Sequence, residues 1–208
     1  FKCDLNNNLD LIKRIIIKYK PNFIVNFAAQ GMVAESWIKP SDWYKTNIIS
    51  QVNLINIIKQ FDFIEKFLQF STPEVYGSTK EWIKEDKNFS PTTPYAISRA
   101  AFDSHILNLS KFSKFPMIIT RTANVFGPGQ QLYRVIPRAI ISTVLNKRFY
   151  LHGDGNSQRS FIHIKDVSSA LIKILQKGKI GNTYHISTNR LISIKNLIKM
   201  IFKIEKNN

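Results

Sequence analysis

Short, continuous apolar runs alternate along this chain with longer segments of helical periodicity. Residues 22–28 (NFIVNFA), 66–71 (KFLQFS) and 116–123 (PMIITRTA) are largely apolar at successive positions, which is typical of strands buried on both faces. Residues 41–61 and 94–112 instead place apolar side chains three or four positions apart, as helices do. The alternation predicts an α/β fold, a doubly wound parallel sheet with helices on both faces.

Shorter elements follow in the second half of the chain. The helix at 94–112 opens on Pro94, which suits a first helical turn, and Ser41 or Asp42 could cap the helix before it. The remaining helices are predicted at 134–147, 164–175 and 193–204, and short strands at 149–153, 159–164 and 183–187.

Basic residues are in strong excess, with 30 Lys and Arg against 14 Asp and Glu and a net charge of +16. They are scattered singly through helical segments such as LIKRIIIKYK, without an arginine-rich run or a nucleic-acid-binding motif. The pattern favours a solvated basic surface that attracts an anionic substrate, and we predict no nucleic-acid partner.

Few residues in this chain could bind a metal. Cys3 is the only cysteine, which excludes an internal disulfide and a multi-cysteine zinc site. The four histidines lack metal-ligand spacing, and His163 lies in a strand-like run where a packing role is expected. We predict no metal. Because the sequence shows no signal peptide and no apolar run near 18 residues, we predict a soluble, cytoplasmic protein without a membrane partner.

One candidate site follows the strand at 66–71, where the sequence continues STPEVYG. Proline cannot donate to a sheet, so the strand must end by Pro73, leaving Thr72 and the carboxylate of Glu74 at its end. By itself this stretch could be a surface turn. Parallel sheets, however, bind ligands at the carboxyl ends of their strands, where FAAQG after the first strand would also lie.

A second candidate pair lies on the helix at 94–112, where Tyr95 and Arg99 are one turn apart on the same face. Such pairs are also common on helix surfaces. Their order behind a strand ending in Ser-Thr resembles the extended short-chain dehydrogenase/reductase family (NAD-dependent epimerases/dehydratases), whose helix carries Tyr-x-x-x-Lys. Within that family the chain looks closest to the nucleotide-sugar 4,6-dehydratases, particularly the dTDP-glucose 4,6-dehydratases.

Further segments resemble motifs of that family in the same order: FKCDL, which we expect to be the end of a strand, NFAAQG, KTN, TRTANVFGPGQ, RVIP and FYLHGDGNSQRSFIHIKDV. The resemblance implies a truncated NAD-binding Rossmann domain at residues 1–123 and a substrate-binding region at 124–208. It implies NAD contacts from Asp4, Leu5, Ala28, Ala29, Gln30, Thr46, Tyr95 and Arg99. It also implies contacts with a nucleotide-diphosphate sugar from Thr72, Asn124, Arg134, Val135 and Arg159.

The family's chemistry would use four of these residues as catalytic groups. Tyr95, made anionic by the cation of Arg99, would take the proton of the sugar 4-hydroxyl while Thr72 holds the 4-oxygen. Glu74 would then remove the C5 proton, the 6-hydroxyl would leave, and hydride would return from the cofactor to C6. Two departures stand out: arginine replaces the family's lysine, and Pro73 replaces its aspartic acid, so Glu74 or water must protonate the leaving group.

Several alternatives remain open at this point. A nucleotide-sugar 4-epimerase would have no use for Glu74, whereas a UDP-glucuronate decarboxylase also carries a glutamate there. None of the eight glycines forms G-x-G-x-x-G, so we expect weak NAD binding and a fragment of a longer enzyme, which could be inactive alone. The resemblance further suggests a homodimer through the helices at 42–60 and 95–112.

Overall fold

The computed structural model describes residues 1–78, 82–85, 88–151 and 153–206. These residues group into two compact units, which are described separately. The first contains Phe1–Thr122 and Ile172–His185, and the second contains Ala123–Leu171 and Ile186–Asn208. The chain therefore leaves the first unit after Thr122 and returns to it before the second is complete.

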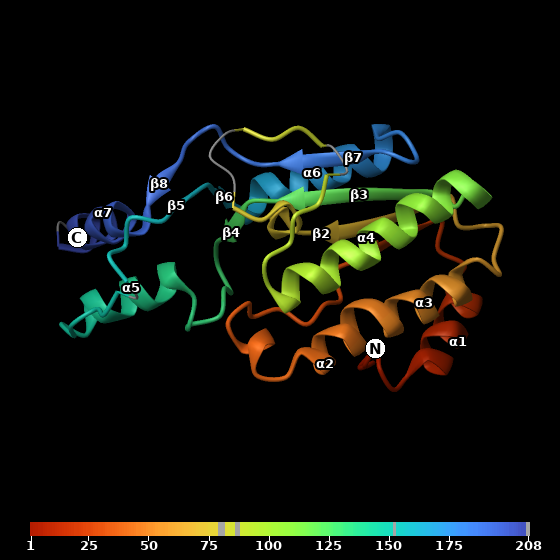
Figure 1. Cartoon of the computed structure of the whole chain (residues 1–208), viewed down its shortest axis with the longest axis horizontal. Helices are drawn as coiled ribbons and strands as arrows, with labels where there is room; N and C mark the ends of the chain where they lie inside the picture. Colours follow the sequence, from red (N-terminus) through yellow and green to blue (C-terminus); the bar gives the residue numbers. More distant parts are fainter. Residues whose placement is uncertain (79–81, 86–87, 152, 207–208) are drawn as a thin grey trace. The chain divides into compact units, whose positions relative to one another are not determined.

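A four-stranded sheet forms the centre of the first unit, in the order β1 (Phe23–Asn26), β2 (Lys66–Ser71), β3 (Met117–Thr122) and β7 (Thr183–Ile186) (Figure 1). β2 is parallel to both β1 and β3. Beside β3, the carbonyl of Met117 accepts from Gly181 N and the carbonyl of Asn182 accepts from Ile119 N, so β7 runs in the same direction. The predicted parallel sheet is confirmed.

Helices lie on both faces of this sheet because side chains alternate along each strand. Phe67 of β2 packs in a core with side chains of α1 (Leu9–Tyr19), α3 (Ser50–Ile58) and α4 (Pro94–Ser113). Its neighbour Lys66 points the other way, and its Nζ donates to the carbonyl of Leu175, 2.6 Å away, near the end of α6 (Ile164–Lys177). The predicted doubly wound arrangement is therefore present.

The helix predicted at 41–61 is interrupted. It begins as α2 (Pro40–Tyr44), passes through a π-helical segment at Lys45–Ile49 and continues as α3. The expected cap at Ser41 or Asp42 is wrong, because Pro40 already occupies the first turn and Lys39 is the capping position without a side-chain cap. Proline is suited to that first position, since it has no N–H that would be left unpaired.

The second unit contains two short strand pairs and two packed helices. β4 (Asn124–Phe126) runs parallel to β6 (Phe161–His163), and β5 (Gln158–Arg159) runs antiparallel to β8 (Ile192–Ser193). α5 (Val135–Val144) and α7 (Ile194–Lys206) share a core around Ala139, Leu197, Ile198 and Ile201.

Two predicted strands are not formed. Residues 149–151 are irregular, and residue 152 lies outside the described part of the chain. Phe149 instead packs on the α5–α7 core, with its ring centroid 6.4 Å from that of Phe202. The expected strand end in FKCDL is also irregular, because the carbonyl of Asp4 accepts the N–H groups of Asn7 and Asn8 in a turn that leads into α1.

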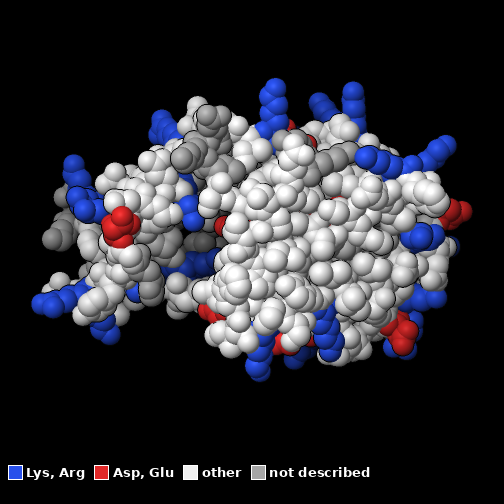
Figure 2. Space-filling view, in the orientation of Figure 1, with Lys and Arg blue, Asp and Glu red and all other residues white. Residues whose placement is uncertain are grey.

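Charged side chains are unevenly distributed over the surface (Figure 2). On the first unit, Lys and Arg appear around the margin of the face in view, whereas the area over α3 and α4 has few charged groups. Within the described residues, every helix is too short or too polar to cross a bilayer.

Candidate active site

The turn after β2 places a hydroxyl and a carboxylate side by side in the sequence. Thr72 caps a 3-10 turn at Pro73–Tyr76, and its Oγ1 accepts the backbone N–H of Glu74 at 3.2 Å. Because that oxygen is used as an acceptor, its own hydrogen remains available to donate to a ligand. Thr72 is 9% exposed, Glu74 is half-buried and Pro73 is exposed. We call Thr72–Tyr76 the β2 turn.

The first turn of α4 presents Tyr95. Thr93 caps this helix by accepting the N–H of Ala96 on Oγ1 at 3.1 Å, and Pro94 occupies the first helical position. The N–H of Tyr95 donates to Ser36 Oγ at 3.2 Å, and its side chain is half-buried. The expected helix start at Pro94 is confirmed. In the described part of the chain, no hydrogen bond joins the Tyr95 hydroxyl to Arg99.

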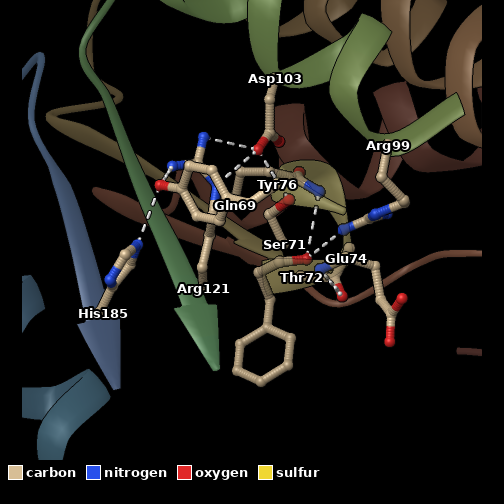
Figure 3. Close-up of polar contacts among 10 residues, drawn as sticks. Gln69, Ser71, Thr72, Glu74, Tyr76, Arg99, Asp103, Arg121 and His185 are labelled. Atoms are coloured by element: carbon tan, nitrogen blue, oxygen red, sulfur yellow. Dashed lines mark hydrogen bonds and ion pairs between the residues drawn. The ribbon is translucent and has the colours of Figure 1, made fainter. Parts of the chain in front are cut away.

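Arg99 connects α4 to the end of β2. It is 3% exposed, and its Nη2 donates to the carbonyl oxygen of Phe70, two residues before Thr72 (Figure 3). Its Nε and Nη1 are buried without a hydrogen-bond partner among the described residues. The structure therefore brings the predicted cation to the strand end that carries Thr72 and Glu74. The Glu74 side chain projects away from the buried polar groups around it (Figure 3).

Sequence analysis missed a buried ion pair behind this turn. Asp103, on α4, accepts from Arg121, on β3, through Nε at 3.1 Å and Nη2 at 2.9 Å, all to the same carboxylate oxygen. Ser71 Oγ donates to that oxygen as well, at 2.8 Å. Burial raises the pKa of Asp103 above its ordinary value, while the charges of Arg121 and Arg99 and the Ser71 hydrogen bond act against that rise.

The network extends from Arg121 to the far end of the β2 turn. Arg121 Nη1 donates to the Tyr76 hydroxyl at 2.6 Å, which is also 2.9 Å from His185 Nε2. The guanidinium lies over the rings of Tyr76 and Phe89, at 5.0 and 4.9 Å from their centroids. The sequence did contain a signal for this buried ion pair, because Arg121 lies in the middle of the apolar run 116–123. A charged side chain buried in such a strand requires a partner.

A second buried network, of amide side chains, fixes the loop after β1. Asn26 Nδ2 donates to Gln51 Oε1 at 2.6 Å and to Gln69 Oε1 at 2.7 Å. Gln51 in turn donates to the carbonyl of Ala28 at 2.6 Å. These amides, placed inside apolar segments, were likewise a signal that the sequence interpretation did not use.

Three of the predicted cofactor residues, Ala28, Ala29 and Gln30, lie in this loop. Asn47 Oδ1 accepts the N–H of Gln30 at 2.8 Å, and its Nδ2 donates to the carbonyl of Gln30 at 3.0 Å. Ala28 and Ala29 are exposed, so the loop presents small side chains on a fixed backbone at the carboxyl end of β1. Such edges are where parallel sheets bind ligands.

The other predicted cofactor residues have separate surroundings. Thr46 lies in the π-helical segment, and its Oγ1 accepts from Asn6 Nδ2 at 3.1 Å. π-Helical segments inside helices often occur at functional sites. Asp4 is exposed, whereas Leu5 is half-buried and packs against the core of the first unit.

The predicted substrate contacts Asn124, Arg134, Val135 and Arg159 all belong to the second unit. Asn124 is exposed, and its Nδ2 donates to the carbonyl of Ser160 at 3.2 Å. Arg134 and Arg159 are exposed and face no carboxylate among the described residues, while Val135 packs on the α5–α7 core. Exposed guanidinium groups that are not paired with carboxylates can bind phosphate.

Comparisons with known proteins point to one family. The sequence profile described as GDP-mannose 4,6 dehydratase matches residues 1–207. The dTDP-D-glucose 4,6-dehydratase of Mus musculus is 34% identical over 196 residues, which cover 94% of this chain and 55% of that protein. The chain thus spans about half the length of the curated relatives it matches.

Solved structures agree with this similarity. The dTDP-glucose 4,6-dehydratase of Bacillus anthracis, in complex with NAD, has a TM-score of 0.88 and 31% identity, covering 98% of this chain and 62% of that chain. The dTDP-glucose 4,6-dehydratase of Streptomyces venezuelae, with NAD and TYD bound, has a TM-score of 0.89 and 26% identity, covering 97% and 62% of the two chains.

Proposed function

This chain belongs to the family of GDP-mannose 4,6 dehydratases, and from that premise we propose that it acts as an NAD-dependent nucleotide-sugar 4,6-dehydratase. The membership confirms the family resemblance read from the sequence motifs. One observation carries the proposed reaction: Thr72 and Glu74 lie in a single turn at the carboxyl end of β2, which Arg99 ties to the helix of Tyr95. The proposed substrate is a nucleoside-diphosphate hexose.

Oxidation at C4 of the sugar is the first task of these residues. A phenol is a weak base at neutral pH, so a nearby cation must favour its anionic form. Tyr95 takes the proton of the 4-hydroxyl in this proposal, and Arg99 supplies the positive charge at the second turn of α4. Thr72 donates its free hydroxyl hydrogen to the 4-oxygen and holds the ring in place.

Elimination of water is the second task. A 4-ketone makes the C5 proton acidic, and Glu74 is the carboxylate available on the β2 turn to remove it. The C6–O bond then breaks, and the 6-hydroxyl leaves as water after protonation. Because Pro73 has no acidic group, the proton comes from Glu74, which has just received one, or from solvent. Elimination would leave a 4-keto sugar with a C5=C6 double bond, and addition of a hydride at C6 and a proton at C5 would then give the 4-keto-6-deoxy sugar.

The residues around the loop after β1 fit an NAD molecule. The backbone of Ala28–Gln30 is held by buried amides, is open to solvent and carries no bulky side chain at its two alanines. In the proposal these residues and Thr46 hold the cofactor, with Asp4 and Leu5 at its adenine. When bound, NAD would accept a hydride from C4 and return it at C6, so no cofactor is consumed.

Residues of the second unit are proposed to bind the sugar nucleotide. Arg134 and Arg159 would pair with the diphosphate, because planar guanidinium groups match phosphate oxygens. Asn124 and Val135 would contact the remainder of the nucleotide. In this proposal residues 1–123 form the NAD-binding domain, which also carries Thr72 and Glu74, and residues 124–208 form the substrate-binding region.

Product analysis tests the proposed function. The chain is incubated with NAD and, separately, with dTDP-glucose, GDP-mannose, UDP-glucose and UDP-glucuronate, and the products are identified by mass spectrometry and NMR. A product lighter by one water with a 4-keto group is expected from one hexose. A 4-epimer would instead assign an epimerase, and release of carbon dioxide a decarboxylase. Calorimetric titration with NAD tests the weak binding that the sequence predicts.

Variants at Glu74 make the assignment specific. Glu74→Gln should lower formation of the dehydrated product by about a hundredfold or more and leave a residual rate, because the amide cannot remove the C5 proton. The matched control is Glu65→Gln, which changes an exposed glutamate whose carboxylate accepts from Asn22 Nδ2 at 2.7 Å. Undiminished dehydration by Glu74→Gln would reject the role proposed for this carboxylate.

We also propose that two copies associate through the weakly charged face over α3 and α4 (Figure 2). A chain of net charge +16 repels its copies, so a face with few charges is the favourable place for contact. On α4, Phe112 is 93% exposed and lines a shallow hollow of about 780 Å³ with His105. Phe112→Lys should lower the mass measured by sedimentation.

A cytoplasmic location stays a prediction from the sequence.

A further inference from the structure

The β2 turn is anchored at both of its ends to one buried ion pair. At the near end, Ser71 Oγ donates to Asp103 Oδ2 at 2.8 Å, immediately before Thr72. At the far end, the Tyr76 hydroxyl accepts from Arg121 Nη1 at 2.6 Å. Asp103 and Arg121 are themselves joined at 2.9 Å (Figure 3). A closed chain of contacts therefore runs from one end of the turn to the other.

The ion pair is well placed to act as a fixed support. The side chains of Arg121 and Asp103 are 0% and 1% exposed. Asp103 belongs to α4 and Arg121 to β3, where it lies opposite Ser71 in the register of β2 and β3. The support thus depends on the two elements that flank the turn, and regular elements hold side chains more accurately than loops do.

Neither member of the pair is part of the proposed chemistry. Both are buried, and they contact the turn through Ser71 and Tyr76, which flank Thr72 and Glu74. Backbone bonds add to the same arrangement, since Gly77 N donates to the carbonyl of Glu74 at 3.1 Å. The positions of the Thr72 hydroxyl and the Glu74 carboxylate consequently depend on contacts made outside the reacting groups.

We propose that Asp103 and Arg121, through Ser71 and Tyr76, are positioning residues that set where Thr72 and Glu74 meet the substrate. The claim that this network affects catalysis rests on the proposed function. The claim that it holds the β2 turn in place rests on the geometry alone. A displacement of about 1 Å at a reacting group can lower a rate by about a hundredfold. Loosening either end of the turn should therefore slow the reaction without removing any reacting group.

Two conservative variants loosen one end each. Tyr76→Phe removes the hydroxyl that accepts from Arg121 and keeps the ring under the guanidinium. Ser71→Ala removes the hydroxyl that donates to Asp103. The matched control is Tyr184→Phe, which also removes one phenolic hydroxyl, the acceptor of Lys179 N at 2.8 Å, away from the β2 turn.

Turnover and amide hydrogen exchange are measured on the full chain for each variant. We expect Tyr76→Phe and Ser71→Ala to lower kcat about tenfold to a hundredfold with KM changed less than about threefold, as expected when alignment rather than binding is lost. Exchange of the Glu74 and Gly77 amides should accelerate in both, while the melting temperature and the core amides change little. Tyr184→Phe should leave kcat, KM and these two amides as in the wild type.

A double-substitution cycle tests whether the effect passes through Glu74. In the Glu74→Gln background, where elimination limits turnover, Tyr76→Phe should cost less than about threefold because there is no carboxylate left to align. An effect as large as in the wild-type background would overturn the proposed route. Unchanged kcat and unchanged turn amides in both single variants would also overturn it.

The exchange measurement separates failure of this inference from failure of the proposed function. If the unaltered chain yields no dehydrated sugar, the proposed function fails. The exchange data alone then decide whether the ion pair holds the β2 turn in place. Faster exchange confined to the β2 turn in Tyr76→Phe and Ser71→Ala then supports the positioning network. Exchange equal to that of Tyr184→Phe refutes it.

Discussion

Substitution of Arg121 by methionine probes the buried ion pair most directly. Arg121→Met removes both charge-assisted contacts to Asp103 and the donor to Tyr76, while a straight apolar chain remains in the space of the arginine stem. Asp103 would keep Ser71 as its partner but lose the opposing charge at 2.9 Å. Loss of one partner from a buried pair typically costs about 3–5 kcal/mol of unfolding free energy.

Proton uptake by the stranded carboxyl limits this cost. Protonating an ordinary aspartate, with a pKa of about 3.9, costs about 4 kcal/mol at pH 7 and about 1.5 kcal/mol at pH 5. Burial already raises the pKa of Asp103, and removal of the cation that opposes this effect raises it further. A raised folded-state pKa gives stability that is complete below the unfolded-state pKa and is lost as pH rises. The variant should therefore be more destabilised, relative to wild type, at pH 7 than at pH 5.

Urea unfolding followed by circular dichroism measures this difference. We expect Arg121→Met to lower the unfolding free energy by about 3–4 kcal/mol at pH 7. At pH 5 the loss should be smaller than at pH 7 by about 2–3 kcal/mol. The control Arg14→Met, on an exposed position of α1, should stay within about 0.5 kcal/mol at both values. Combining Asp103→Leu with Arg121→Met should recover at least about 1 kcal/mol at pH 7, because no charge is then left unpaired.

Two results would refute this reasoning. If Arg121→Met costs less than about 1 kcal/mol at pH 7, the pair does not support the fold. If the cost is equal at both pH values, the stranded carboxylate is not its source.

Three further predictions concern α4. Thr93→Ala should lower the unfolding free energy by about 1 kcal/mol in urea titrations, because the helix loses its side-chain cap. Burial and the charge of Lys59 lower the pKa of His105, so its NMR titration should have a midpoint below the ordinary histidine value. The contribution of His105 to the unfolding free energy should be complete above its unfolded-state pKa and should be lost as pH falls through its folded-state pKa. A His105→Gln variant should lack this pH-dependent contribution. Arg99→Lys should keep turnover within about tenfold, whereas Arg99→Met should lower it about a hundredfold or more, because Tyr95 then lacks the neighbouring cation. Equal rates for the two variants would contradict the proposed role of the charge.

Local patterns in the sequence were sufficient for the main elements of the first unit. The apolar run at 66–71 forms β2, and the run at 116–123 forms β3 except for one residue at each end. Pro94 opens α4 as expected. These features depend on residues close in the chain: apolar side chains at successive positions suit a strand covered on both faces, and proline suits a first helical turn. Thr72 and Glu74 followed for the same reason, since Pro73 must end the strand just before them.

Only the tertiary structure decided which buried polar groups meet. Arg121 is visible in the sequence as a charge inside an apolar strand, but its pairing with Asp103 depends on β3 lying beside α4. Asn26 likewise finds Gln69 only because β1 and β2 are neighbours in register. Phe149 shows the reverse case, in which a strand-like run became a loop because its ring was needed in the α5–α7 core. Local periodicity encodes the faces of an element, whereas the partners of those faces come from chain segments far apart in sequence, and burial makes each such partner obligatory.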